Sequence, residues 1–235
     1  MKAKPFYFKQ FTIYQDQSAL KVGTDGVLLG AWTNCNHATS ILDIGSGTGV
    51  VSLMLAQRCT AKITAIEIEA DAAKQSEENF QNSVWSKRLL CLNDSIQHYS
   101  TSLNAEKFDL IVSNPPFYSI QKETTKRSTA RSEQELNVVE LLQCVSQLLA
   151  QKGKFSLIFP SNRKNELMLI AEQVQLFPSR ICYIKGNAKT EVKRIIVEFG
   201  FEPKIVEENH LIIEKERHHY TEEYQALLQP YLTIF

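Results

Sequence analysis

The residues with the clearest chemical potential are Asn114, Pro115, Pro116 and Phe117, which directly follow the apolar run 108–113. That run predicts a buried strand. Two consecutive prolines fix two φ angles and push the residue before each of them out of the helical region. An amide and an aromatic ring are thereby held on a rigid turn at a strand's carboxyl end, where open α/β sheets bind ligands. Taken alone, the tetrapeptide also fits an ordinary strand-ending turn, so its interpretation depends on a cofactor site elsewhere.

A glycine-rich turn, Asp43-Ile-Gly-Ser-Gly-Thr-Gly49, indicates such a site between a predicted strand at 40–44 and a predicted helix from residue 50. Glycines let the backbone turn sharply and approach a ligand, and a helix amino end offers free N–H groups. Glu67 ends a second predicted strand, at the spacing expected for a carboxylate that binds ribose hydroxyls. Asp94 follows a third predicted strand near 89–92.

These features alone also fit a site for NAD, but two details favour S-adenosylmethionine. The turn lacks the full G-x-G-x-x-G, and Asp43 lies inside its first strand, where a carboxylate can meet an ammonium group but not a pyrophosphate. Asp94 is an acceptor for an adenine amino group. The sequence therefore predicts a cofactor site made by Asp43, Gly45, Gly47, Gly49, Glu67 and Asp94.

Strands alternate with helices along the chain, which predicts one α/β domain over residues 1–235 with a mostly parallel, doubly wound sheet. Seven strands are expected, with helices on both faces. Beyond those above, we expect a hairpin or edge strand at 6–14, a short helix starting near Gly26 and capped by Thr24 or Asp25, and a helix at 70–82. Farther along are expected helices at 133–150, closed by Gly153, at 162–176 and at 221–228, and strands at 155–159, 179–184, 192–201 and from Leu211.

Composition excludes several classes of protein. The 235 residues contain 26 Lys+Arg and 26 Asp+Glu, so overall charge does not indicate a nucleic-acid partner, and local patches would have to bind one. The amino end lacks the apolar core of a secretory signal, and no apolar run is long enough to span a bilayer. The five scattered cysteines and His218-His219 lack metal-ligand spacing. We expect a cytoplasmic protein, preferably monomeric, without metal and without a membrane partner.

The order of these motifs resembles class I S-adenosylmethionine-dependent methyltransferases over roughly residues 41–159. The resemblance implies a Rossmann-like fold. It also implies that Asp43 and Gly45 lie under the methionine moiety, that Glu67 binds the ribose hydroxyls, and that Asp94 meets the adenine amine.

The tetrapeptide at 114–117 matches the Asn/Asp-Pro-Pro-Tyr/Phe motif of methyltransferases that act on planar nitrogens. Such a nitrogen has a delocalised, weakly nucleophilic lone pair. The Asn114 side-chain oxygen and the Pro115 carbonyl can accept its two N–H bonds, and Asn114 also borders the cofactor. Phe117 would stack on a planar acceptor, which is worth about 1–3 kcal/mol for a nucleobase. Asn114, Pro115 and Phe117 are therefore the predicted catalytic residues, with Pro116 beside the acceptor.

Wider similarity narrows the acceptor. The segments 21–32 and 82–85, followed by the Asn114 motif, are similar to bacterial tRNA(Val) adenosine N6-methyltransferases. This resemblance implies tRNA as the partner and methylation of the adenosine just 3′ of the anticodon. We expect residues 1–38 to cover the cofactor, with contacts from Lys21 and Thr24. A loop at 118–132 would meet RNA phosphates through Lys122, Lys126, Arg127 and Arg131, and a second basic patch comprises Lys185, Lys189, Lys193 and Arg194.

Four alternatives are weighed at this point. A protein glutamine N5-methyltransferase would use the same turn, although such enzymes usually carry an additional amino-terminal helical domain. A DNA adenine methyltransferase typically has a sizeable target-recognition domain. A non-catalytic tRNA- or nucleotide-binding module would not need both Asn114 and the intact glycine turn. An NAD-dependent oxidoreductase is disfavoured because no hydride-transfer constellation is evident.

Overall fold

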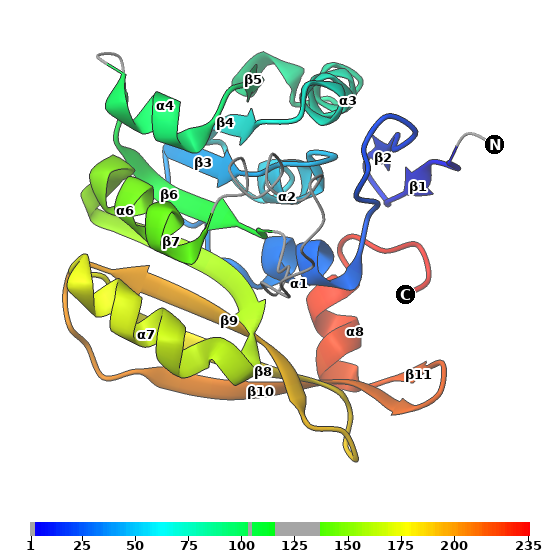
Figure 1. Cartoon of the computed structure of the whole chain (residues 1–235). Coiled ribbons are helices and arrows are strands. Elements are labelled where there is room, and N and C mark those ends of the chain that lie inside the picture. Colours follow the sequence, from blue (N-terminus) through cyan, green and yellow to red (C-terminus); the bar gives the residue numbers. More distant parts are fainter. Residues whose placement is uncertain (1–2, 103–104, 116–136) are drawn as a thin grey trace, which may run out of the picture.

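The computed structural model describes residues 3–102, 105–115 and 137–235 (Figure 1). Within this part of the chain, nine strands form one large sheet. Their spatial order from one edge is β5 (Leu89–Asn93), β4 (Lys62–Glu67), β3 (Ser40–Ile44), β6 (Phe108–Ser113), β7 (Leu149–Pro160), β9 (Val192–Gly200), β8 (Phe177–Asn187), β10 (Glu207–Glu216) and β11 (His219–Tyr220).

The sheet confirms the predicted doubly wound arrangement and extends it. Strands β5, β4, β3, β6 and β7 are parallel, and β9 runs antiparallel between β7 and β8. These seven strands are the expected set. Strand β10 then pairs in parallel with β8, with Leu211 opposite Ile184, and β11 pairs antiparallel with β10. The sequence indicated a strand from Leu211 but not that it would lengthen this sheet, where it covers the backbone edge that β8 would otherwise expose.

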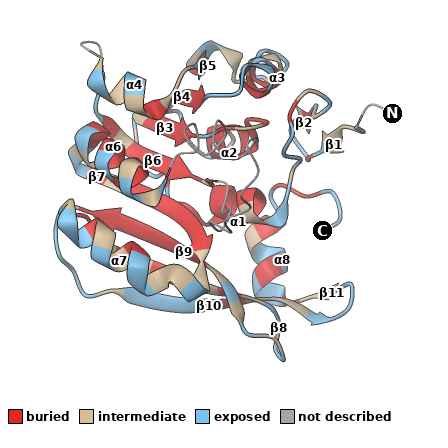
Figure 2. Ribbon diagram, viewed as in Figure 1, coloured by how far each residue is buried: buried red, intermediate tan, exposed pale blue. Residues whose placement is uncertain are grey.

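Helices cover both faces of the sheet (Figures 1 and 2). The side chains of α1 (Thr24–Trp32), α2 (Val50–Ala56), α3 (Ala70–Gln81) and α8 (Glu222–Leu228) pack in one core. Those of α4 (Ile96–Thr101), α6 (Val138–Leu148) and α7 (Lys164–Gln173) pack in the other. Two single turns, η1 (Ser86–Arg88) and η2 (Ser161–Arg163), lie between elements. Neighbouring residues of β3 alternate between the two cores, as expected of a strand buried on both faces.

The amino-terminal residues form the predicted hairpin and then contact the other end of the chain. Strands β1 (Phe6–Tyr7) and β2 (Thr12–Ile13) pair antiparallel, apart from the large sheet. The Lys9 amide donates to the Tyr231 carbonyl at 2.7 Å, and its Nζ donates to the Phe235 carbonyl at 2.8 Å. The two termini therefore support each other at one side of the domain (Figure 1).

Three local predictions were wrong. Helix α1 starts at Thr24 with Gly23 at its N-cap, so neither Thr24 nor Asp25 caps it. Helix α6 ends at Leu148, because Leu149 already pairs with Phe108 as the first residue of β7. Gly153 lies inside that strand, where a side chain would come within 2.9 Å of the Phe108 carbonyl. The predicted start of this helix, at 133–136, lies outside the described residues.

Helix α4 was not predicted. Ser95 caps it by accepting a hydrogen bond from the His98 amide at 3.1 Å. Its six residues are too few to show helical periodicity in the sequence.

Gly49 is the position at which the fold tolerates a side chain least. Its φ is +77°, and a Cβ would lie 2.5 Å from the ring of Phe80, a fully buried residue of α3. Gly49→Ala should lower the free energy of unfolding by about 2–4 kcal/mol, since left-handed strain and overpacking add. Gly186→Ala is the matched control, because its nearest contact would be an ordinary 3.6 Å. Equal losses in urea unfolding of the two variants would contradict this account.

Candidate active site

The glycine-rich turn connects β3 to α2 at the carboxyl edge of the sheet. Gly45, Gly47 and Gly49 all have φ between 57° and 77°, in the left-handed region that favours glycine. A Cβ built on Gly45 or Gly47 would meet nothing within 4 Å, so these two residues face open space. A bound group can therefore approach the backbone of the turn directly.

Glu67 ends β4 and joins this turn to the neighbouring strand. Its carboxylate accepts hydrogen bonds from the Gly47 amide at 2.8 Å and from the Glu69 amide at 3.0 Å. Each carboxylate oxygen keeps further lone pairs for a ligand. The predicted ribose-binding group is thus oriented by two backbone amides at the side of the open glycine turn.

Asp43, in contrast, lies beneath the turn with 1% of its surface exposed. It accepts a hydrogen bond from the Ser52 hydroxyl of α2 at 2.7 Å. Burial raises the pKa of Asp43 to about 6, and the nearby Glu67 carboxylate acts in the same direction, while the Ser52 hydrogen bonds oppose the shift. The ionised form of Asp43 is therefore unfavourable at neutral pH, and a cation bound above it would stabilise that form.

Asp94 follows β5, and its carboxylate has partners that the sequence analysis missed. Its oxygens lie 2.8 and 2.9 Å from Nδ1 of His98, one turn along α4, and one of them accepts from the Ser95 amide at 2.7 Å. The i, i+4 spacing of Asp94 and His98 was the available signal. The neighbouring Asn93 has a structural role: its side chain donates a hydrogen bond to the Glu67 carbonyl at 2.9 Å and fixes the end of β4.

Asn114 and Pro115 follow β6, next to the strand that carries the glycine turn. The Ser113 hydroxyl donates to the Ile44 carbonyl at 3.0 Å, which ties the two strand ends together. A Cβ on Gly26 of α1 would lie 3.6 Å from the Asn114 Nδ2, so the first turn of α1 lies against this amide. No described residue hydrogen-bonds to the Asn114 side chain. The amide is thus positioned by packing, with its polar atoms available to a ligand.

Helix α1 is itself held by an ion pair across the sheet edge. The Asp25 carboxylate in its first turn lies 2.9 Å from Nε of Arg194 on β9. From the sequence, Arg194 is expected in a basic patch and Asp25 is a possible cap of α1. The ion pair gives both residues a role in positioning α1, while the place of Arg194 in an RNA-binding patch stays a prediction.

Lys21 lies before α1 and Thr24 begins it, in different environments. The Lys21 ammonium donates to the carbonyls of Gln15 and Ser18, at 2.5 and 2.6 Å, and so closes a loop of its own segment. Thr24 is exposed as the first residue of α1.

Asn79, on α3, connects this amino-terminal segment to the glycine turn. The buried amide accepts from the Tyr14 amide at 2.9 Å and donates to the Tyr14 and Thr48 carbonyls at 2.8 and 2.9 Å. Gln75, one turn earlier, accepts from the Gln17 amide at 2.9 Å. The segment at 14–17 thus lies along α3, beside the turn. No motif in the sequence indicated these amides.

Several predicted site residues lie outside the part of the chain that the structure describes: Pro116, Phe117, Lys122, Lys126, Arg127 and Arg131. Among the described residues, no group of three or more His, Cys, Asp or Glu side chains could hold a metal ion. None of the described helices is long and apolar enough to cross a membrane.

Comparison with known proteins shows which family this chain resembles. Residues 18–175 match the model of the methyltransferase small domain. A tRNA1(Val) (adenine(37)-N6)-methyltransferase of Christiangramia forsetii is 45% identical, over 98% of both chains. The chain belongs to this methyltransferase family. A similarly named protein of Trichodesmium erythraeum is 40% identical over 98% of each chain.

Solved structures of methyltransferases have the same fold. A predicted O-methyltransferase from Agrobacterium tumefaciens superposes with a TM-score of 0.70 at 19% identity, covering 88% of this chain and 96% of the other. A putative RNA methyltransferase from Pyrococcus horikoshii superposes with a TM-score of 0.56 at 15% identity, covering 79% and 87%. The chain thus has the Rossmann-like fold of these proteins, and its family makes it an S-adenosylmethionine-dependent methyltransferase. The open glycine turn and the flanking carboxylates are chemically suited to that donor.

The buried carboxyl of Asp43 yields a prediction about pH. Its folded pKa of about 6 exceeds its ordinary value of 3.8, so the folded protein binds more protons than the unfolded chain between these values. Stability contributed by this group is therefore lost as pH rises from about 4 to 7, by about 3 kcal/mol. Asp43→Asn should remove the loss, so that its stability relative to the wild type rises over this range in urea unfolding.

Asp109→Asn is the control with the opposite sign. Hydrogen bonds from Thr39 and Ser40 lower the pKa of Asp109, so the wild type gains stability from this group as pH rises. A wild-type profile that runs parallel to that of Asp43→Asn would contradict the assignment.

The amide of Asn79 yields a second prediction. Asn79→Ala removes three hydrogen bonds and should lower stability by about 1–3 kcal/mol. It should also accelerate hydrogen exchange at the Tyr14 amide, which mass spectrometry of the segment would detect. Asn82→Ala, at the exposed end of the same helix, is the control. Unchanged exchange in Asn79→Ala would show that the segment is held by other contacts.

Proposed function

We propose that this enzyme transfers a methyl group from S-adenosylmethionine to the exocyclic N6 of an adenosine in tRNA. The target we propose is the adenosine 3′ of the anticodon in tRNA(Val). One observation carries the chemistry: the Asn114 amide follows β6, beside the strand end that bears the open glycine turn, and no described residue hydrogen-bonds to its side chain. The names of relatives at 40–45% identity supply the acceptor.

The donor site follows from the groups around the turn. Glu67 would accept hydrogen bonds from the ribose hydroxyls, because two backbone amides already orient its carboxylate. Asp94, oriented by His98, would accept one from the adenine amine. Asp43 would stabilise the ammonium of the methionine moiety from below, with Gly45, Gly47 and Gly49 allowing close approach. Thr24 would contact the donor from α1, and Lys21 would act by closing the loop before it.

Bound S-adenosylmethionine supplies an electrophilic methyl group on a sulfonium. The protein's task is then to orient the weakly nucleophilic amine. The Asn114 side-chain oxygen and the Pro115 carbonyl would accept its two N–H bonds and so direct its lone pair at the methyl group. Positioning of this kind would suffice for an in-line displacement in which the nitrogen–methyl bond forms as the methyl–sulfur bond breaks. The donor would leave as a neutral thioether, and one N–H proton would pass from the methylated nitrogen to solvent. The position of Asn114 against Gly26 makes α1 a support for this geometry.

The remaining parts of the proposal concern the chain's organisation. We propose that residues 1–38 cover the donor, supported by the attachment of Tyr14 and Gln17 to α3 beside the glycine turn. Phe117 as stacking partner, Pro116 beside it, and the basic loop 118–132 remain predictions from the sequence. We also propose that the enzyme is a monomer and that it acts in the cytoplasm on tRNA.

Asn114→Ala tests the proposal directly. With labelled S-adenosylmethionine and unmodified tRNA(Val), the wild type should place label on N6 of the adenosine 3′ of the anticodon. The variant should lose about 10²- to 10³-fold in kcat, as when one oriented transition-state hydrogen-bonding group is removed. Donor affinity by calorimetry should stay nearly unchanged.

Asn162→Ala provides a matched control, because Asn162 is an exposed amide after β7 at the same sheet edge. Full turnover by Asn114→Ala would remove Asn114 from the mechanism. Label on a protein glutamine but not on tRNA would replace the proposed acceptor, and binding of tRNA without any transfer would make the chain a binding module.

A further inference from the structure

The β8–β9 hairpin rises from the same sheet edge as Asn114. Strand β9 runs antiparallel, so its start lies level with the end of β7, where Arg194 is opposite Pro160. The hairpin then continues beyond that edge through residues 186–191 (Figure 1). With strands about 4.8 Å apart, β9 lies roughly 10 Å from β6. A base bound at Asn114 would thus bring the neighbouring nucleotides of its strand toward this hairpin.

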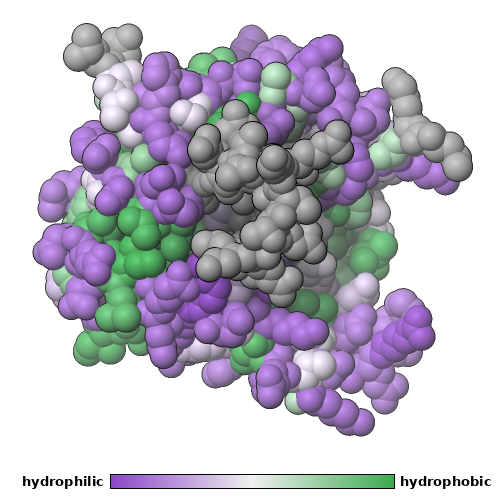
Figure 3. All heavy atoms as spheres, viewed as in Figure 1, coloured by the Kyte–Doolittle hydropathy of each residue, from purple (hydrophilic) through white to green (hydrophobic). Residues whose placement is uncertain are grey.

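The hairpin carries more cations than it can neutralise. Residues 185–194 include Lys185, Lys189, Lys193 and Arg194 but a single acid, Glu191. Arg194 is paired with Asp25. Among the described residues, no acidic group pairs with the three lysines. In the view of Figure 1 the hairpin lies at the bottom of the molecule, and the surface there is mostly hydrophilic (Figure 3).

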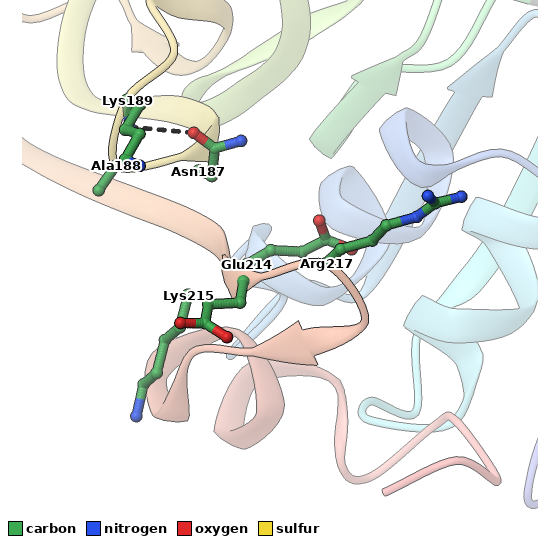
Figure 4. Close-up of a pocket in the computed structure, with 7 residues that line it drawn as sticks. Asn187, Ala188, Lys189, Glu214, Lys215 and Arg217 are labelled. Carbon is green, nitrogen blue, oxygen red and sulfur yellow. Dashed lines mark hydrogen bonds between the residues drawn. The ribbon is translucent and has the colours of Figure 1, made fainter.

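A cleft of about 400 Å³ separates the hairpin turn from the turn between β10 and β11 (Figure 4). Its lining residues are Asn187, Ala188, Lys189, Glu214, Lys215, Glu216 and Arg217. Lys215 pairs with Glu222 at 3.1 Å, and Glu214 accepts from the His218 amide at 3.4 Å. Lys189 and Arg217 are cations on opposite walls that are not paired with a described acid, while Glu214 and Glu216 are acids on the same rim.

We propose that the β8–β9 hairpin and this cleft form a second RNA-contact surface, which binds backbone phosphates of the tRNA stem next to the methylated base. This inference rests on the proposed function. Lysines spread along an exposed hairpin provide mobile point charges, which suit a series of phosphates better than one small anion. Contacts of this kind position the RNA without reading its sequence. They should therefore act on RNA affinity and leave the chemical step alone.

The test replaces Lys185, Lys189 and Lys193 together by Gln. Binding to tRNA(Val) should weaken roughly tenfold or more at low salt, and the slope of log K against log salt should become shallower by about two to three. The KM for tRNA should rise while kcat and donor affinity stay at wild-type values. Lys62→Gln, Lys87→Gln and Lys152→Gln combined is the control, because these exposed lysines lie at the opposite, amino edge of the sheet.

A variant in which negative charges are removed tests the same surface, because its affinity for RNA should increase. Glu191→Gln together with Glu216→Gln removes the exposed acids of the same surface and should tighten RNA binding with a steeper salt slope. Equal RNA affinity in the hairpin triple variant, the amino-edge control and the wild type would overturn the inference. If the wild type itself neither binds nor methylates tRNA, the proposed function fails instead, so the two failures are distinguishable.

Discussion

The site depends on the attachment of the glycine turn to the end of the neighbouring strand. The amides of Gly45 and Ser46 donate to the Ile66 carbonyl at 2.8 and 3.3 Å, and that of Gly47 donates to the Glu67 carboxylate at 2.8 Å. A left-handed, glycine-rich backbone costs more conformational entropy to order than any other, and these bonds offset part of that cost. Because they fix the turn relative to β4, the same bonds place Glu67 beside the surface on which the donor would lie. The hydrogen bonds that make the glycine turn rigid therefore also position Glu67 for the ligand.

Beneath the turn, the buried carboxyl of Asp43 lowers stability instead of adding to it. Asp43 is buried with one hydroxyl partner, which makes its ionised form unfavourable in the free protein. Such a group lowers stability at neutral pH by an amount that other packing must offset. It becomes useful when a cation binds, because the unfavourable charge is then neutralised. We infer that the buried carboxylate lowers stability and, at the same time, makes the site selective for a donor that carries an ammonium group.

Patterns of adjacent residues predicted most of the fold, whereas contacts between distant segments could not be predicted. Periodicity located the strands from β3 to β9, and the residue types at their ends located Asp43, Glu67, Asp94 and Asn114. The sequence gives no sign that Asn79 binds Tyr14, because one amide on an amphipathic helix resembles any other. Asp25 and Arg194 lie 169 residues apart, and only the topology brings them together. Helix α4 and strand β11 are too short for periodicity to show.

A structure of the protein with S-adenosylhomocysteine, the product of the donor, would test these site assignments. We expect the ribose hydroxyls within hydrogen-bonding distance of the Glu67 carboxylate and the adenine amine at Asp94. We also expect the sulfur near Asn114, above the open backbone of Gly45 and Gly47. A ligand that leaves Glu67 bonded only to the amides of Gly47 and Glu69, or that occupies the cleft beside Lys189, would contradict them.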